Sequence, residues 1–193
     1  MLKLKKIFMI RAIDVFLSFF ALIVLLPLIF LIYCLIYLEN KSPIFKQVRM
    51  GKNMRKFTLI KFRTMHIGTE SLATHLIDET KITNIGVILR KTKLDELPQL
   101  WNVLRGDMSL VGPRPCLPSQ FELIDMRQKY DLYKYLPGIT GLAQIKSIDM
   151  SDPILLANTD FKMMKNLNLR KYFHYLLLTF FGSGFGDKVK KIY

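Results

Sequence analysis

Residues 15–38 read VFLSFFALIVLLPLIFLIYCLIYL, a run of 24 residues without a charged side chain. As a helix, at about 1.5 Å per residue, this run would be about 36 Å long, which is enough to cross a bilayer. A cleaved signal peptide is disfavoured because its apolar core is shorter and ends at small residues, whereas Glu39-Asn40-Lys41 follows here. The pattern predicts a membrane anchor over residues 1–40, followed by a separate domain over residues 41–193.

The charges that flank the run bear on its orientation. Four basic residues precede it within 1–14, and six follow it within 41–56. Basic flanks stay on the cytoplasmic side, and a straight spanning helix cannot place both flanks there. Pro27 removes one backbone hydrogen bond in the middle of the run, so a re-entrant helix broken at Pro27 would satisfy both flanks. A spanning helix kinked at Pro27 is the alternative, and the residues alone leave both open.

Asp14 is the one acid at the start of the run. It follows Arg11 by three residues, a spacing that puts both side chains on one face of the expected helix. We expect the two to pair and to hold the start of the helix at the level of the lipid head groups.

The chain of 193 residues carries 29 lysines and arginines against 15 acids, a formal net charge of +14. Such a charge predicts an anionic partner: membrane head groups, nucleic acid or a phosphate-bearing substrate. The two cysteines, Cys34 and Cys116, have neither the pairing of a disulfide framework nor the spacing of a zinc site. The domain therefore fits a reducing compartment, most simply the cytoplasm.

Beyond the anchor, short extended and helical segments alternate, which is typical of an α+β domain that is mostly helical. Ser42-Pro43 and a turn signal at 50–53 frame two short strands within 42–65. Three prolines within 107–118 exclude a regular helix there. Residues 136–141 are expected to form a turn-rich loop. Helices are expected in part of 69–91, over 95–105 and 119–130, from Ser151-Asp152-Pro153 onward, and over 169–182, the last lying along the membrane surface.

Asp95 and Glu96 are adjacent carboxylates at the expected start of helix 95–105 in an otherwise basic chain. One interpretation is structural, because Asp is a strong N-cap and acids in a first turn complement the helix dipole. The other is chemical: adjacent acids point in different directions, so one could attack a substrate while the other binds a metal ion. Residue type alone leaves both interpretations open.

Four basic residues could serve the same site. Lys61 and Arg63 alternate on one face of an expected strand, Arg90 precedes the acids by five residues, and Arg114 lies between two prolines. Each alone is typical of a solvated surface charge. Together with an acidic pair they indicate a diphosphate site, where arginines and Mg²⁺ would neutralise phosphate oxygens. The sequence holds no Walker A loop and no GxGxxG after a strand, so nucleotide binding by those routes is not predicted.

Four stretches, in this order and spacing, resemble the bacterial sugar transferase family, the monotopic phosphoglycosyl transferases that start glycan assembly on polyprenyl phosphate. The resemblance covers nearly the whole chain, and its length is similar to the small form of the family. The stretches are KFRTM at 61–65, LDELPQL at 94–100, GDMSLVGPRP at 106–115 and PGITGLAQ at 137–144.

The resemblance implies a two-step reaction at the bacterial inner membrane, on its cytoplasmic face. Asp95 would attack the sugar-bearing phosphate of a UDP-sugar and release UMP, and polyprenyl (undecaprenyl) phosphate would then accept the phosphosugar. Glu96 would bind Mg²⁺. Lys61, Arg90 and Arg114 match basic family positions near the phosphates. The family also implies a re-entrant helix, although its Ser-Pro break is Leu26-Pro27 here.

Asp160 aligns with an acid that the family places near the active site, although Lys162 and Met163 replace the family's aromatic residues after it. Residues 112–118 and 148–151 are similar to those of some small family members, which favours an N-acetylated sugar. The sequence does not determine which sugar is transferred. Two other functions stay open: a non-catalytic, basic membrane-surface binding protein, and a one-step metal-dependent transferase. Membrane lipid is an expected partner, and nucleic acid is not.

Overall fold

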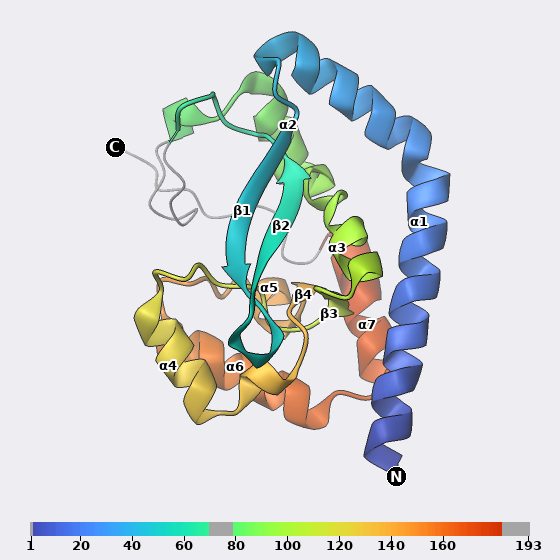
Figure 1. The fold of residues 1–193 in the computed structure, drawn as a ribbon, viewed down its shortest axis with the longest axis vertical. Coiled ribbons are helices and arrows are strands. Elements are labelled where there is room, and N and C mark those ends of the chain that lie inside the picture. The colour runs from blue at the N-terminus through green and yellow to red at the C-terminus, as the bar shows by residue number, and fades with distance from the viewer. Residues whose placement is uncertain (1, 70–78, 183–193) are drawn as a thin grey trace.

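The computed structural model describes residues 2–69 and 79–182. Its first element, α1 (Leu2–Asn40), is one continuous helix with Pro27 inside it. Figure 1 shows α1 running along the whole length of the molecule and curving over it toward its C-terminal end. The predicted helix is thus present, and at Pro27 the helix is not interrupted. Whether α1 turns back within a bilayer stays a prediction.

The two sides of α1 differ. Asp14, Ser18, Ile32 and Ile36 are buried against the rest of the protein. Much of the remaining surface is apolar and exposed, as expected for a helix that contacts lipid. By length and composition, Phe8–Asn40 could cross a membrane. The exposed large apolar side chains of α1 include Phe16, Phe19, Phe20, Ile23, Val24, Leu26, Phe30, Leu31, Leu35 and Leu38.

A two-stranded antiparallel hairpin forms the centre of the domain (Figure 1). Its strands are β1 (Ile44–Met50) and β2 (Lys56–Phe62), joined through the 3₁₀ turn η1 (Lys52–Met54). The register places Phe45 opposite Lys61. The prediction of two strands within 42–65 is confirmed.

A second, parallel pair was not predicted. It joins β3 (Ser109–Val111), in the stretch where only a regular helix was excluded, to β4 (Gly138–Thr140), in the stretch expected to be a turn-rich loop. The pair brings Gly112 and Gly138 so close that a Cβ on Gly138 would lie 2.0 Å from the Gly112 nitrogen. Only glycine fits this crossing. The crossing fixes the start of the proline-rich loop that carries Arg114.

The helices follow the predicted pattern with shifted ends. The prediction for 69–91 is confirmed for its last part, while residues 70–78 lie outside the described residues. The predicted helix 95–105 is split, because a 3₁₀ turn, η4, precedes the α-helix. In chain order these elements are η3 (Glu79–Lys81), α2 (Asn84–Thr92), η4 (Leu94–Glu96), α3 (Gln99–Arg105), α4 (Phe121–Lys129), η5 (Leu132–Lys134), α5 (Leu142–Ile145), α6 (Pro153–Asn166) and α7 (Leu169–Phe180).

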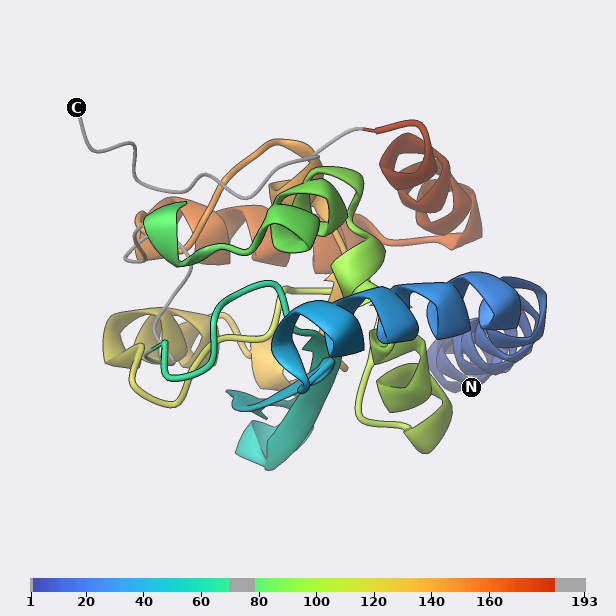
Figure 2. The same cartoon turned by 90° about the horizontal axis from the view of Figure 1, so that it is seen from above.

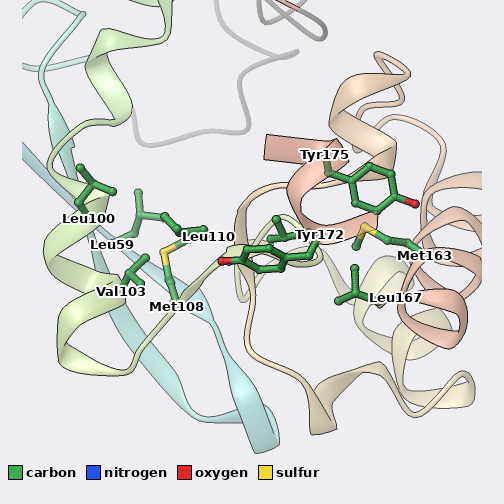
Figure 3. Packing of buried hydrophobic residues seen from close by; sticks show 10 residues of the cluster. Leu59, Leu100, Val103, Met108, Leu110, Met163, Leu167, Tyr172 and Tyr175 are labelled. Atoms are coloured by element: carbon green, nitrogen blue, oxygen red, sulfur yellow. The ribbon is translucent and has the colours of Figure 1, made fainter. Parts of the chain in front are cut away.

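The largest buried cluster joins β2, α3, β3, α6 and α7 (Figure 3). Tyr172 of α7 lies at its middle, between Leu110 and Met163. Partly buried residues of α1, among them Ile13 and Leu17, pack against the same cluster. Figure 2 shows α1 lying beside both α3 and α7. The first half of α1 is therefore a component of the domain core as well as the start of the apolar segment.

Candidate active site

Asp95 and Glu96 lie in η4, directly after α2. Lys93 makes the turn between the two elements in a left-handed conformation, with φ of 57°, which is strained for a residue with a side chain. Its carbonyl accepts the Glu96 N–H at 3.1 Å. Lys93, not Asp95, is therefore the N-cap of this turn, which excludes the N-cap part of the structural interpretation, while both acids do lie in the first turn. Asp95 is 4% exposed.

Glu96 contacts Arg114 directly. The Arg114 Nη2 lies 3.0 Å from the Glu96 Oε1, and both side chains stay partly exposed. This contact joins the LDELPQL stretch to the proline-rich loop, although 18 positions separate the two residues in the chain. The structure thus brings the predicted metal ligand and one predicted phosphate ligand together.

Arg90 is buried between α2 and the end of β2. Its Nε donates to the Thr64 Oγ1 at 2.8 Å. The two segments approach closely at Gly86, where an added Cβ would lie 2.2 Å from the Thr64 carbonyl oxygen. Since η4 contacts both α2 and β2, Arg90 lies in the part of the fold that packs against the acidic turn.

Lys61 and Arg63 both lie on the ring of Phe45. The Lys61 Nζ is 5.7 Å from the ring centroid, and the Arg63 guanidinium carbon is 5.4 Å from it. Arg63 also donates from Nε to the Ser42 carbonyl at 2.9 Å. That bond ties β2 to the segment that leaves α1, so Arg63 has a structural contact here. Its contact with a substrate stays a prediction.

Asp160 is buried behind the site. Its Oδ2 accepts from the Arg127 Nη2 at 2.6 Å, and both side chains are at most 3% exposed. Burial alone would lower the pKa of Arg127, but the Asp160 carboxylate raises it overall, so the guanidinium stays charged. The Arg127 Nη1 donates to the Arg114 carbonyl at 2.8 Å. Asp160 thus holds Arg127, and Arg127 holds the backbone of Arg114, which is a positioning geometry.

Asp14 has a role that the sequence did not indicate. The expected exposed position at the level of the lipid head groups is wrong, because Asp14 is buried inside the protein, although the charge of Arg11 still acts on its carboxylate. Its Oδ1 accepts from the Leu110 N–H at 2.9 Å, the Ser109 hydroxyl at 3.1 Å and the Tyr172 hydroxyl at 2.6 Å. Burial and the carboxylate of Asp14 raise the pKa of Tyr172, so its phenol stays a donor. Asp14 therefore fastens α1 to β3 and α7.

Arg11 fastens α1 at a second point. Its Nη2 donates to the Val103 carbonyl at 2.6 Å, and its Nη1 donates to the Met108 carbonyl at 3.2 Å. These carbonyls lie at the end of α3 and just before β3, where a cation stabilises the last carbonyls of a helix. Arg11 and Asp14 together hold the GDMSLVG segment from the side of α1.

Asn102, in α3, was also missed. It is fully buried, and its amide bonds the edge of β2 twice: Oδ1 accepts the Ile60 N–H at 3.0 Å, and Nδ2 donates to the Thr58 carbonyl at 2.8 Å. An asparagine in a helix is usually neutral or unfavourable. Its position among Leu100 and Val103 is the one sequence signal that could have indicated a buried role.

The donor set fits Mg²⁺. This ion is commonly held by one or two carboxylates together with substrate phosphates, rather than by a cage made wholly of protein. Glu96, the predicted metal ligand, supplies a carboxylate. Within residues 2–69 and 79–182, no group of three or more histidine, cysteine or acidic side chains could hold a metal ion. A substrate diphosphate would have to complete the coordination.

A family model for the bacterial sugar transferases matches residues 5–184. The chain belongs to the bacterial sugar transferase family. One relative within the curated proteins is the UDP-N-acetylgalactosamine-undecaprenyl-phosphate N-acetylgalactosaminephosphotransferase of Aeromonas hydrophila, 35% identical over 82% of this chain. Another is the exopolysaccharide production protein PSS of Rhizobium leguminosarum bv. phaseoli, 42% identical over 72% of this chain.

The match to these relatives differs in extent. The aligned part covers 40% of the Aeromonas protein and 74% of the Rhizobium protein. The undecaprenyl-phosphate glucose phosphotransferase of Komagataeibacter xylinus is 42% identical over 70% of this chain and 27% of its own length. The recognition of the bacterial sugar transferase family from its sequence stretches is thus confirmed. The names of the Aeromonas and Komagataeibacter relatives differ in the sugar.

Proposed function

We propose that this bacterial sugar transferase moves a sugar 1-phosphate from a UDP-sugar to undecaprenyl phosphate and releases UMP. The observation that carries the proposal is the Glu96–Arg114 ion pair beside the buried Asp95. It gathers two carboxylates and a guanidinium at one point, as transfer of a phosphoryl group requires. Relatives named as undecaprenyl-phosphate phosphotransferases support the choice of substrates.

In the first step an Asp95 carboxylate oxygen attacks the phosphorus that bears the sugar. The bond from that phosphorus to the oxygen bridging the two phosphates breaks, and UMP leaves with the electron pair. In the second step a phosphate oxygen of undecaprenyl phosphate attacks the same phosphorus. The bond to Asp95 breaks, which regenerates the carboxylate and yields an undecaprenyl diphosphate sugar.

The surrounding residues bind and orient the substrates. Arg114 binds phosphate oxygens and holds Glu96, while Lys61 and Arg90 add positive charge. Glu96 would hold Mg²⁺, which when bound neutralises negative charge on the diphosphate. Arg127 and Asp160 keep the Arg114 backbone in place. The reaction takes place at the cytoplasmic face of the bacterial inner membrane, with α1 as the anchor.

The test uses purified protein with Mg²⁺, undecaprenyl phosphate and a panel of UDP-sugars, scored by UMP release. Asp95→Asn should abolish release with the fold retained, because the amide is a poor nucleophile. Asp125→Asn, at an exposed position of α4, is the matched control and should stay active. Release of UDP in place of UMP would contradict transfer of a phosphosugar, and an active Asp95→Asn variant would remove the nucleophile. No release with any sugar would favour the non-catalytic binding protein.

A further inference from the structure

A cleft of about 530 Å³ lies at the start of α1, away from the acidic turn. Its walls come from α1, the turn of the β1–β2 hairpin, β3, the segment around η5, and α6 with the residue after it. None of the described residues of the candidate active site, Lys61, Arg90, Asp95, Glu96 or Arg114, belongs to its lining. The residues proposed to act on the diphosphate of the UDP-sugar therefore do not line this cleft.

The charge of the lining is strongly positive. Four cationic side chains face one carboxylate, that of Asp14. Asp14 accepts three hydrogen bonds from β3 and α7, so its charge is directed inward. Lys134 also pairs with Asp131, and the Arg11 guanidinium donates to the Val103 and Met108 carbonyls. The four cations come from separate elements around one cleft, an arrangement that attracts an anion. They are Arg11, Lys52, Lys134 and Lys165.

The rest of the lining is apolar and aromatic. Tyr130 and Phe161 stack with ring centroids 5.0 Å apart, and the Lys165 Nζ lies 5.8 Å from the Phe161 ring. Aliphatic side chains complete the lining, so a fully hydrated anion would have no favourable contact with much of the cleft surface. An amphiphile, with a charged head and an apolar body, matches both parts. The aliphatic lining residues are Ile10, Val111, Leu136, Met164 and Leu167.

The position of the cleft along α1 indicates that the amphiphile is a membrane lipid. Ile10, Arg11 and Asp14 line it, and the uncharged run begins at Val15. Exposed apolar side chains lie on both sides of this level, with Phe8 and Met9 before it and others from Val15 onward. A lipid head group at this level would meet the lysines, while its chains meet apolar surface.

We propose that this cleft binds the phosphodiester head group of an anionic membrane phospholipid. The lysines neutralise the phosphate, and the apolar lining takes the first part of an acyl chain. Occupancy would couple α1, η5 and α6 to the bilayer surface at a fixed depth. This inference is independent of the proposed transferase reaction, so each can fail alone.

The test is binding of short-chain phosphatidylglycerol to the full chain in neutral detergent, measured by native mass spectrometry. The cleft variant is Lys52→Ala/Lys134→Ala/Lys165→Ala. The control is Lys146→Ala/Lys162→Ala/Lys171→Ala, which removes the same charge at exposed positions outside the lining. The cleft variant should bind at least about tenfold more weakly than the natural chain, while the control changes little. Replacement of the three cleft lysines by arginine should retain binding.

Three outcomes would overturn the proposal. Equal losses in the cleft and control variants would mean general charge attraction. Undiminished binding in the cleft variant, or lost binding in the arginine variant, would remove the lysines from the site. Equal binding of phosphatidylcholine, or full competition by glycerol phosphate at the same concentration, would mean that the anionic lipid is not the ligand.

Discussion

The buried pair of Arg127 and Asp160 gives the sharpest test of how the site is held. In Arg127→Met the Asp160 carboxylate would keep its 1% exposure and lose the cation 2.6 Å away. Breaking a buried pair from one side costs about 3–5 kcal/mol, since a buried charge is left uncompensated. For a chain of this size each kcal/mol lowers Tm by about 2–4 °C, so Tm should fall by roughly 10 °C.

A double variant separates stability from positioning. Arg127→Met/Asp160→Leu removes both charges, and such replacements are often neutral or stabilising, so most of the lost Tm should return. UMP release should be low in Arg127→Met and should remain low in the double variant, because in both the Arg114 carbonyl lacks the donor 2.8 Å away. Near-UV circular dichroism during heating and the rate of UMP release measure the two properties. An unchanged Tm in Arg127→Met, or full activity in the double variant, would refute the reasoning.

Two further predictions concern α1. Asp14→Ala leaves the Leu110 N–H and the Ser109 and Tyr172 hydroxyls without their shared acceptor, and should lower the free energy of unfolding by about 1–3 kcal/mol for each donor that stays buried. Asp14→Asn keeps an acceptor oxygen and should lower it less. Chemical unfolding measures both losses, and equal losses would contradict the role of Oδ1. The orientation of α1 in the membrane can be tested by cysteine labelling of Lys6→Cys and Lys41→Cys, each in a Cys34→Ser background. If the helix is re-entrant, both cysteines should be labelled only from the cytoplasmic side. An external label at position 6 with an internal label at position 41 would mean that α1 spans the membrane.

Local signals in the sequence were sufficient for the elements that depend on neighbouring residues. The hairpin follows from Ser42-Pro43 and the turn at 50–53, and α6 begins where Asp152 and Pro153 indicated, with Asp152 capping the Leu155 N–H at 2.9 Å. The parallel pair of β3 and β4 was missed because each strand has three residues. Its pairing joins Ser109 to Gly138, and no local pattern encodes that contact.

The roles of charged residues were harder to predict for the same reason. Asp14 and Asp160 both read as charges near a surface or a substrate, yet each is buried against a partner far away in the chain. Asp14 meets Tyr172, 158 positions later, and Asp160 meets Arg127. The family stretches identified the acidic turn and Arg114, whereas the residues that position them carry no distinctive spacing.

The contacts of α1 change how its purpose is understood. Arg11 and Asp14 bind the segment that leads into the proline-rich loop, and Ile32 and Ile36 pack in a cluster with Phe62 and Leu89. The helix is therefore built into the domain at both ends of its apolar run. In the proposed function, a site assembled on such a helix stays close to the membrane, where a lipid phosphate and a soluble nucleotide sugar can meet.

The most direct measurement is intact-protein mass spectrometry of the chain after incubation with Mg²⁺ and its UDP-sugar, without undecaprenyl phosphate. We predict a mass increase of one phosphosugar, mapped to Asp95 by peptide analysis, with an equal amount of UMP released. Addition of undecaprenyl phosphate should then remove the adduct. UMP release that requires undecaprenyl phosphate, with no adduct on Asp95 under rapid quenching, would contradict the two-step account and favour a one-step transfer.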